Sequence, residues 1–113
     1  MSGETRPDMG MVAICDIDEI PDRRALRRRL PDGTQIAVAR LGGLGGRVVA
    51  FENRCPHVDG PIGLGKIAGA VVTCPWHFFR FDLETGAAVG LDSVMRLRVF
   101  KTSIEGGRIL VEL

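Results

Sequence analysis

What the sequence lacks excludes several classes of protein. Its 113 residues contain no apolar run long enough to span a bilayer. The longest candidate, IAGAVVTC, is broken by Gly69 and ends at Cys74. The N-terminal segment MSGETRPDMG is polar and has no signal-peptide core. A net charge of +1 gives no general attraction to nucleic acid or to an anionic membrane. We therefore expect a cytoplasmic protein with neither of these as a partner.

Cysteine and histidine are scarce as well. The chain has three cysteines, an odd number without the dense spacing of a disulfide framework. Cytosolic proteins keep such thiols reduced, which agrees with the expected location. Cys15 lies in the apolar stretch MVAIC, where we expect a buried thiol that behaves as a small hydrophobic side chain rather than as a redox sensor.

The length and the spacing of turn residues predict the fold class. A chain of this length forms one hydrophobic core, so we expect a single domain over residues 1–113. Short apolar or alternating segments are separated by frequent glycine and proline turns. This pattern predicts an all-β protein, an antiparallel β-sandwich or small barrel.

Individual strands follow from the same pattern. The expected strands are 12–15, 34–41, 47–53, 67–74, 95–104 and 108–113, with turns at 31–33, 42–46, 85–86 and 106–107. Alternation places Met95, Leu97 and Val99 on one face of their segment. The segment 21–30, PDRRALRRRL, fits either a helix capped by Asp22 or a strand, and we favour the strand.

The chemistry concentrates in two short segments, CPH and CPWH. Cys55-x-His57 is followed, sixteen residues later, by Cys74-x-x-His77, which together use both histidines of the chain. Thiolate and imidazole are ligands of zinc, copper and iron–sulfur centres. A common zinc finger pairs two cysteines in one half and two histidines in the other. Here each half has one of each, which suits a binuclear centre such as a Rieske [2Fe–2S] cluster. A zinc-bound structural or interaction module is the alternative.

The stretch NRCPH…CPWHFFRFDLETG resembles the Rieske iron–sulfur proteins, in particular the small Rieske-type ferredoxins of bacterial ring-hydroxylating oxygenases. The resemblance covers nearly the whole chain. It implies one [2Fe–2S] cluster in a subdomain of about 53–82. By the same resemblance Cys55 and Cys74 hold the inner iron, and His57 and His77 hold the outer iron nearer solvent.

The resemblance also shows where this chain departs from Rieske proteins of respiratory complexes. Those proteins have a disulfide between the two loops, at positions that match Gly60 and Trp76 here. They place a serine and a tyrosine hydroxyl near the cluster, where this chain has Phe79 and Phe81. Hydrogen bonds to the sulfurs raise the potential, so the resemblance implies a potential in the lower part of the Rieske range.

The residues around the two segments support the same interpretation. Gly60, Gly63 and Gly65 allow close approach of the backbone, and we expect their amide groups to be free to point at sulfur. Trp76 and Phe79 are expected to form an apolar cover or part of the core.

The small number of histidines restricts the function. A terminal oxygenase needs a second iron held by two histidines and a carboxylate, and both histidines are already used. The segment 63–68 matches a loose nucleotide-binding fingerprint, but no strand–helix unit surrounds it. We therefore expect an electron carrier and not an enzyme, passing single electrons from a flavin-dependent reductase to a terminal oxygenase. The alternative is the Rieske small subunit of an assimilatory nitrite reductase.

A run of arginines precedes the first turn. Its members are Arg23, Arg24, Arg27, Arg28 and Arg29. The run fits either a solvated strand face or a basic docking patch for an acidic reductase or oxygenase.

Overall fold

The computed structural model describes residues 11–41, 47–56, 60–76, 79–90 and 95–112. Their regular elements are strands and two short 3-10 helices, Ile17–Glu19 and Ile62–Leu64, which confirms the all-β prediction. No helix among these residues is long and apolar enough to cross a membrane. The strands are β1 Met11–Asp16, β2 Leu26–Arg29, β3 Gln35–Arg40, β4 Val48–Glu52, β5 Lys66–Ala68, β6 Val71–Thr73, β7 Arg80–Asp82, β8 Ala88–Val89, β9 Val99–Phe100, β10 Thr102–Glu105 and β11 Arg108–Glu112.

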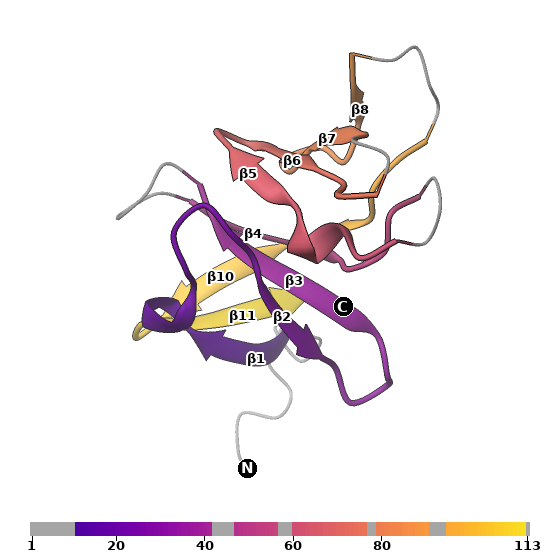
Figure 1. Ribbon diagram of the computed structural model, residues 1–113. Helices are drawn as coiled ribbons and strands as arrows, with labels where there is room; N and C mark the ends of the chain where they lie inside the picture. The colour runs from indigo at the N-terminus through magenta and orange to yellow at the C-terminus, as the bar shows by residue number, and fades with distance from the viewer. Residues whose placement is uncertain (1–10, 42–46, 57–59, 77–78, 91–94, 113) are drawn as a thin grey trace.

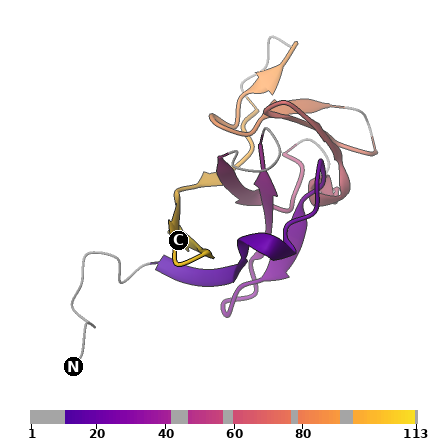
Figure 2. The ribbon, with the colours of Figure 1, turned by 90° about the vertical axis from the view of Figure 1, so that its left-hand side faces the viewer.

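The strands form three antiparallel sheets. The outer sheet has the order β1-β11-β10, the middle sheet β2-β3-β4-β9 and the third sheet β5-β6-β7-β8. The third sheet lies at one end of the molecule, and the pairing of β1 with β11 lies at the other (Figures 1 and 2). The chain passes from the middle to the outer sheet between β9 and β10, where Thr102 Oγ1 donates to the Val48 carbonyl at 2.9 Å.

Both faces of the middle sheet are buried at strands β3 and β4, which are apolar at almost every position. Alternate side chains face opposite ways, so one face presents Ala37 and Phe51 and the other presents Ile36 and Val38. The first face packs against the third sheet, and the second packs against the outer sheet through Ile109. The middle sheet is therefore shared by two cores.

Several predicted turns are confirmed. Gly106 and Gly107 both have positive φ, +60° and +83°, and they join β10 to β11 through a two-residue loop. The expected alternation in β11 follows, with Ile109 and Val111 fully buried. Gly33, at φ +94°, closes the turn between β2 and β3. The glycine run 42–46 lies outside the described residues, but the flanking strands β3 and β4 pair as expected.

Two predicted strands are divided in the structure. The segment 67–74 is not one strand but most of a hairpin, in which β5 and β6 turn at Gly69. Gly69 has φ +60°, and it thereby supplies the left-handed conformation that a tight hairpin needs. No atom lies within 4 Å of the place that a Cβ would take at this position. The segment 95–104 is also interrupted: Arg96 forms an isolated bridge with Ala87, before β9 and β10 join different sheets.

Other strand predictions hold. Residues Met95, Leu97 and Val99 all contact the core between the middle and third sheets, as the alternation predicts. The ambiguous segment 21–30 contains strand β2, so the helix is excluded there.

The third sheet is an insertion into the middle sheet. The chain leaves β4 at Glu52, builds β5 to β8 and returns at β9. The two ends of the insertion meet, because the Glu52 amide donates to the Arg98 carbonyl at 2.9 Å. Both cysteine segments lie within this insertion.

Candidate metal centre

Cys55 and Cys74 lie in the same hydrophobic core, and both are fully buried, with no exposed surface. Cys55 follows β4 and Cys74 follows β6, so two separate strands deliver the two thiols. A buried thiol is a good ligand for a soft metal because its surroundings exclude water and competing oxygen ligands. The structure therefore places two of the four predicted ligands in one buried core. His57 and His77 lie outside the described residues.

Each cysteine begins a loop that is closed in the same way. The Cys55 amide donates to the carbonyl of Gly60 at 2.9 Å, and the Cys74 amide donates to the carbonyl of Phe79 at 2.7 Å. Both bonds span five residues, so the two loops have equal length although their sequences differ. Each histidine lies in sequence between the two ends of one closed loop.

Trp76 connects the second loop to the first. A Cβ added to Gly60 would lie 2.9 Å from Cε3 and 3.1 Å from Cδ2 of the Trp76 ring, so the ring rests against the bare backbone of Gly60. The ring is nevertheless 58% exposed. The prediction of core packing is wrong for Trp76, which links the loops at the surface. Phe79, in contrast, is partly buried and packs against the core, as expected.

Asn53 anchors the segment that follows the first loop and was not singled out from the sequence. Its side-chain oxygen accepts a hydrogen bond from the Gly63 amide at 2.6 Å, while its backbone amide donates to the Gln35 carbonyl of β3 at 2.9 Å. It thereby ties the 3-10 helix Ile62–Leu64 to the middle sheet. The signal in the sequence was an asparagine at the end of a buried strand, a residue type that bonds readily to nearby backbone.

Two glycines do not have the role that the sequence suggested. The Gly63 amide is bonded to Asn53, and the Gly65 amide donates to the Ile62 carbonyl at 2.9 Å, so neither is free to point at sulfur. Their lack of a side chain matters for packing. A Cβ at Gly65 would lie 2.1 Å from the carbonyl oxygen of Thr73, which no side chain could accommodate without moving the backbone.

Cys15 is remote from this core. It is 8% exposed and belongs to the second core, with Ile109 and Val111, which confirms the expected buried thiol. Burial raises the pKa of the Cys15 thiol, and the nearby Glu19 carboxylate raises it further. The three cysteines form no disulfide with one another.

The predicted arginine patch is divided between several environments. Arg28 pairs with Glu19, Nη2 to Oε1, at 2.9 Å. The Arg24 guanidinium donates to the Leu64 carbonyl at 3.1 Å, and the Arg23 carbonyl accepts from the Ile67 amide at 3.3 Å. Arg24 and Arg23 therefore help to attach the inserted sheet to the rest of the molecule. Arg23 does so in a left-handed backbone conformation, with φ +61°.

The fold and this site define an all-β protein that presents two buried thiols, each at the start of a short closed loop. Comparison with known proteins names the class. Residues 10–101 match the model of the Rieske [2Fe-2S] domain, so the chain belongs to this family. The two thiols fit the cysteine half of its mixed Cys₂His₂ ligand set, and the cofactor is a Rieske [2Fe–2S] cluster rather than zinc.

Individual relatives narrow the class. The ferredoxin component of the p-cumate 2,3-dioxygenase system of Pseudomonas putida is 32% identical over 104 residues, covering 91% of this chain and 86% of the relative. The ferredoxin of carbazole 1,9a-dioxygenase from Nocardioides aromaticivorans IC177 is 28% identical, with TM-score 0.79 over 90% of this chain and 96% of that one. The candidate small subunit of an NADH-dependent nitrite reductase from Mycobacterium tuberculosis is 25% identical, with TM-score 0.80 over 91% and 94%. The chain is thus a Rieske protein similar to dioxygenase ferredoxins.

Proposed function

We propose that this protein carries single electrons from a flavin-dependent reductase to a terminal oxygenase. The observation that carries the proposal is the pair of fully buried thiols on matched closed loops in a Rieske domain. When bound, a Rieske cluster takes up and releases one electron at a time. The similarity to dioxygenase ferredoxins supports the choice of partners.

We assign four ligands: Cys55 and Cys74 to the inner iron, and His57 and His77 to the outer iron. The burial of the two thiols supports the inner position. The order of the residues supports the outer one, since each histidine falls between the ends of a loop whose base is fixed by a backbone hydrogen bond.

The chain's own residues provide rigidity rather than catalysis. Asn53 fixes the 3-10 helix that follows the first loop to the middle sheet, and Trp76 fixes the second loop to the first. A rigid ligand shell reduces the rearrangement that accompanies a change of charge. We therefore propose that the protein is not an enzyme and that its partners bind transiently. We also propose a cytoplasmic location, because three thiols without a disulfide suit a reducing compartment.

The ligand assignment is tested by counting metals in four proteins: the wild type, Cys55→Ser, Cys74→Ser and Cys15→Ser. The wild type and Cys15→Ser should contain two irons per chain and show the low average g-value of mixed nitrogen–sulfur ligation after dithionite reduction. Cys55→Ser and Cys74→Ser should contain no cluster. Stoichiometric zinc in a colourless wild type, or a full cluster in either ligand variant, would contradict the assignment.

The carrier role needs a separate test, because one observation favours an alternative. The likeness to the nitrite reductase small subunit supports a role as a subunit of such an enzyme. Size-exclusion chromatography of an extract from the native source distinguishes the two. A carrier should elute alone at its own mass of 12.2 kDa, whereas a subunit should elute with a much larger sirohaem flavoprotein.

A further inference from the structure

Strand β2 divides its arginines between the two faces of the middle sheet. Arg27 pairs with Ala37 and Arg29 with Gln35, and residues directly opposite one another share a face. Ala37 belongs to the core that contains Cys55 and Cys74. Arg27 and Arg29 therefore lie on the side of the sheet that carries the metal centre, and Arg28 lies on the opposite side.

The arginines also differ in their partners. The Arg28 guanidinium is paired with Glu19, and its second nitrogen donates to the backbone. Arg27 and Arg29 are exposed, and within the described part of the chain neither has a carboxylate partner. Two positive charges on the side of the metal centre are thus available to a partner.

These two charges border a groove that leads to Trp76. One hollow of about 410 Å³ is lined by residues that include Arg27, Arg29, Gln35 and Asn53. A second hollow, of about 440 Å³, is lined by Trp76 and shares Gln35 and Asn53 with the first. The two hollows adjoin at these shared residues, and we call them together the Arg27–Trp76 groove.

The charge of the groove is unbalanced. Within the part of the chain that the structure describes, the lining includes Arg27 and Arg29, which have no carboxylate partner there, and one carboxylate, that of Glu52. The side chain at its far end is a largely exposed tryptophan. An arginine guanidinium can bind one carboxylate through two parallel hydrogen bonds. Tryptophan side chains often contribute much of the binding energy at protein–protein interfaces.

We propose that the Arg27–Trp76 groove binds an acidic, extended segment of the redox partner. The carboxylates of the segment lie against Arg27 and Arg29, and an apolar side chain lies on Trp76. Because Trp76 immediately precedes the proposed ligand His77, a segment seated in this way brings the partner to the metal centre. The proposal rests on the carrier function and names the chemistry of the partner's contact.

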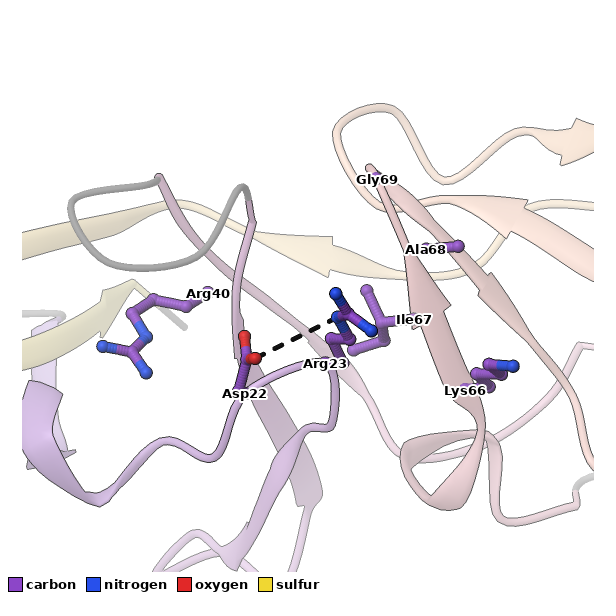
Figure 3. A pocket seen from close by; sticks show the side chains of 7 residues that line it. All are labelled: Asp22, Arg23, Arg40, Lys66, Ile67, Ala68 and Gly69. Atoms are coloured by element: carbon purple, nitrogen blue, oxygen red, sulfur yellow. Dashed lines mark ion pairs between the residues drawn. The ribbon is translucent and has the colours of Figure 1, made fainter.

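Another basic hollow does not offer the same arrangement. It has a volume of about 490 Å³ and is bordered by Arg23, Arg40 and Lys66. Figure 3 shows that the guanidinium of Arg40 and the ammonium of Lys66 point away from Arg23, to opposite sides. Arg23 lies beside Asp22, at 4.0 Å, and Arg40 donates to the Ile20 carbonyl. These cations do not converge on one ligand.

The test uses labelled poly-L-glutamate as the probe and the intact, cluster-loaded protein. Binding is followed by anisotropy of the label, and the emission of Trp76, the one tryptophan of the chain, reports contact at the end of the groove. The double variant Arg27→Gln/Arg29→Gln should bind about tenfold more weakly than the wild type at about 20 mM salt. Arg28→Gln, which removes one positive charge where the double variant removes two, should change binding less than about twofold, below the roughly threefold loss expected if each charge contributed equally.

Three outcomes would overturn the proposal. The first is an equal loss in Arg28→Gln and the double variant, which would mean that net charge alone decides binding. The second is equally tight binding of single-stranded poly(U), which would mean a general polyanion surface. The third is concentration-dependent self-association that the double variant abolishes, which would identify a second copy as the occupant. None of these depends on electron transfer, so a wild type that binds the probe but transfers no electrons would contradict the carrier function and not the groove.

Discussion

The ring of Trp76 lies against the backbone of Gly60 and so joins the two loops that begin at Cys55 and Cys74. Replacing Gly60 by alanine places a methyl group 2.9 Å from the ring, so that the Trp76 ring or the backbone of Gly60 must move. We expect Gly60→Ala to lower the free energy of unfolding by about 1–3 kcal/mol and to speed the loss of iron. Urea unfolding and the decay of visible absorbance measure these effects.

A double-mutant cycle makes this expectation specific to the pair. In a Trp76→Ala background the added methyl group has no ring to meet, so Gly60→Ala should have a much smaller effect. Additive losses in the two single variants would show that the contact does not couple the loops.

Gly65 should tolerate substitution least of all the loop glycines discussed here. A Cβ at this position would lie 2.1 Å from the Thr73 carbonyl oxygen, and backbone cannot move aside cheaply. We expect Gly65→Ala to cost about 3 kcal/mol or more of the free energy of unfolding. Gly69→Ala is the matched control: it meets no atom within 4 Å and has only the strain of its positive φ, about 1–2 kcal/mol. Equal melting temperatures for the two variants would contradict this account.

Asn53 should stabilise the folded state mainly through one acceptor atom, its side-chain oxygen. Asn53→Ala leaves the amide of the buried Gly63 without its 2.6 Å partner, and we expect a loss of about 1–3 kcal/mol in the free energy of unfolding. Asn53→Asp retains an acceptor oxygen and should keep most of the stability. If both variants lost iron at the same increased rate, the hydrogen bond would not be what holds the segment after the first loop in place.

Cys15 should affect stability at alkaline pH. Because burial raises its pKa in the folded state, the unfolded chain releases the proton first, and the folded state loses stability as pH rises above the thiol's ordinary pKa. Below that pH the thiol is neutral in both states and has no such effect. The free energy of unfolding should therefore fall more steeply between about pH 8 and 10 in the wild type than in Cys15→Ala, as followed by urea titrations. Parallel curves would exclude the effect.

The reduction potential should lie in the lower part of the Rieske range, which extends from about −150 to +300 mV. The resemblance to respiratory Rieske proteins matches Phe79 and Phe81 to the positions of their hydroxyl donors, and Phe81 is fully buried in the same core as Cys55 and Cys74. A potentiometric titration should find a midpoint below zero. A value well above zero would mean that other donors compensate for the missing hydroxyls.

The sequence predicted those features that depend on local pattern. The alternation in β11, the diglycine turn before it and the close spacing of cysteine and histidine each follow from neighbouring residues. The division of residues 67–74 into two strands was missed, because a single glycine within an apolar run does not distinguish a hairpin from a bulge.

The contacts between distant residues could not be predicted. The Gly60–Trp76 contact spans sixteen positions, and the approach of Gly65 to Thr73 depends on how the insertion folds back on itself. The same is true of the arginines: their clustering in the sequence suggested one patch, whereas strand alternation and Glu19 divide them.

The insertion of the metal-binding sheet has a further consequence, for protein engineering. Its two ends are joined by the hydrogen bond between Glu52 and Arg98, so the rest of the molecule needs only a short connection at that point. Closing a short loop in place of the inserted residues costs little conformational entropy. The two parts are thus suited to exchange rather than to separation: another redox insert grafted at this point must also cover the face of the middle sheet that carries Ala37 and Phe51.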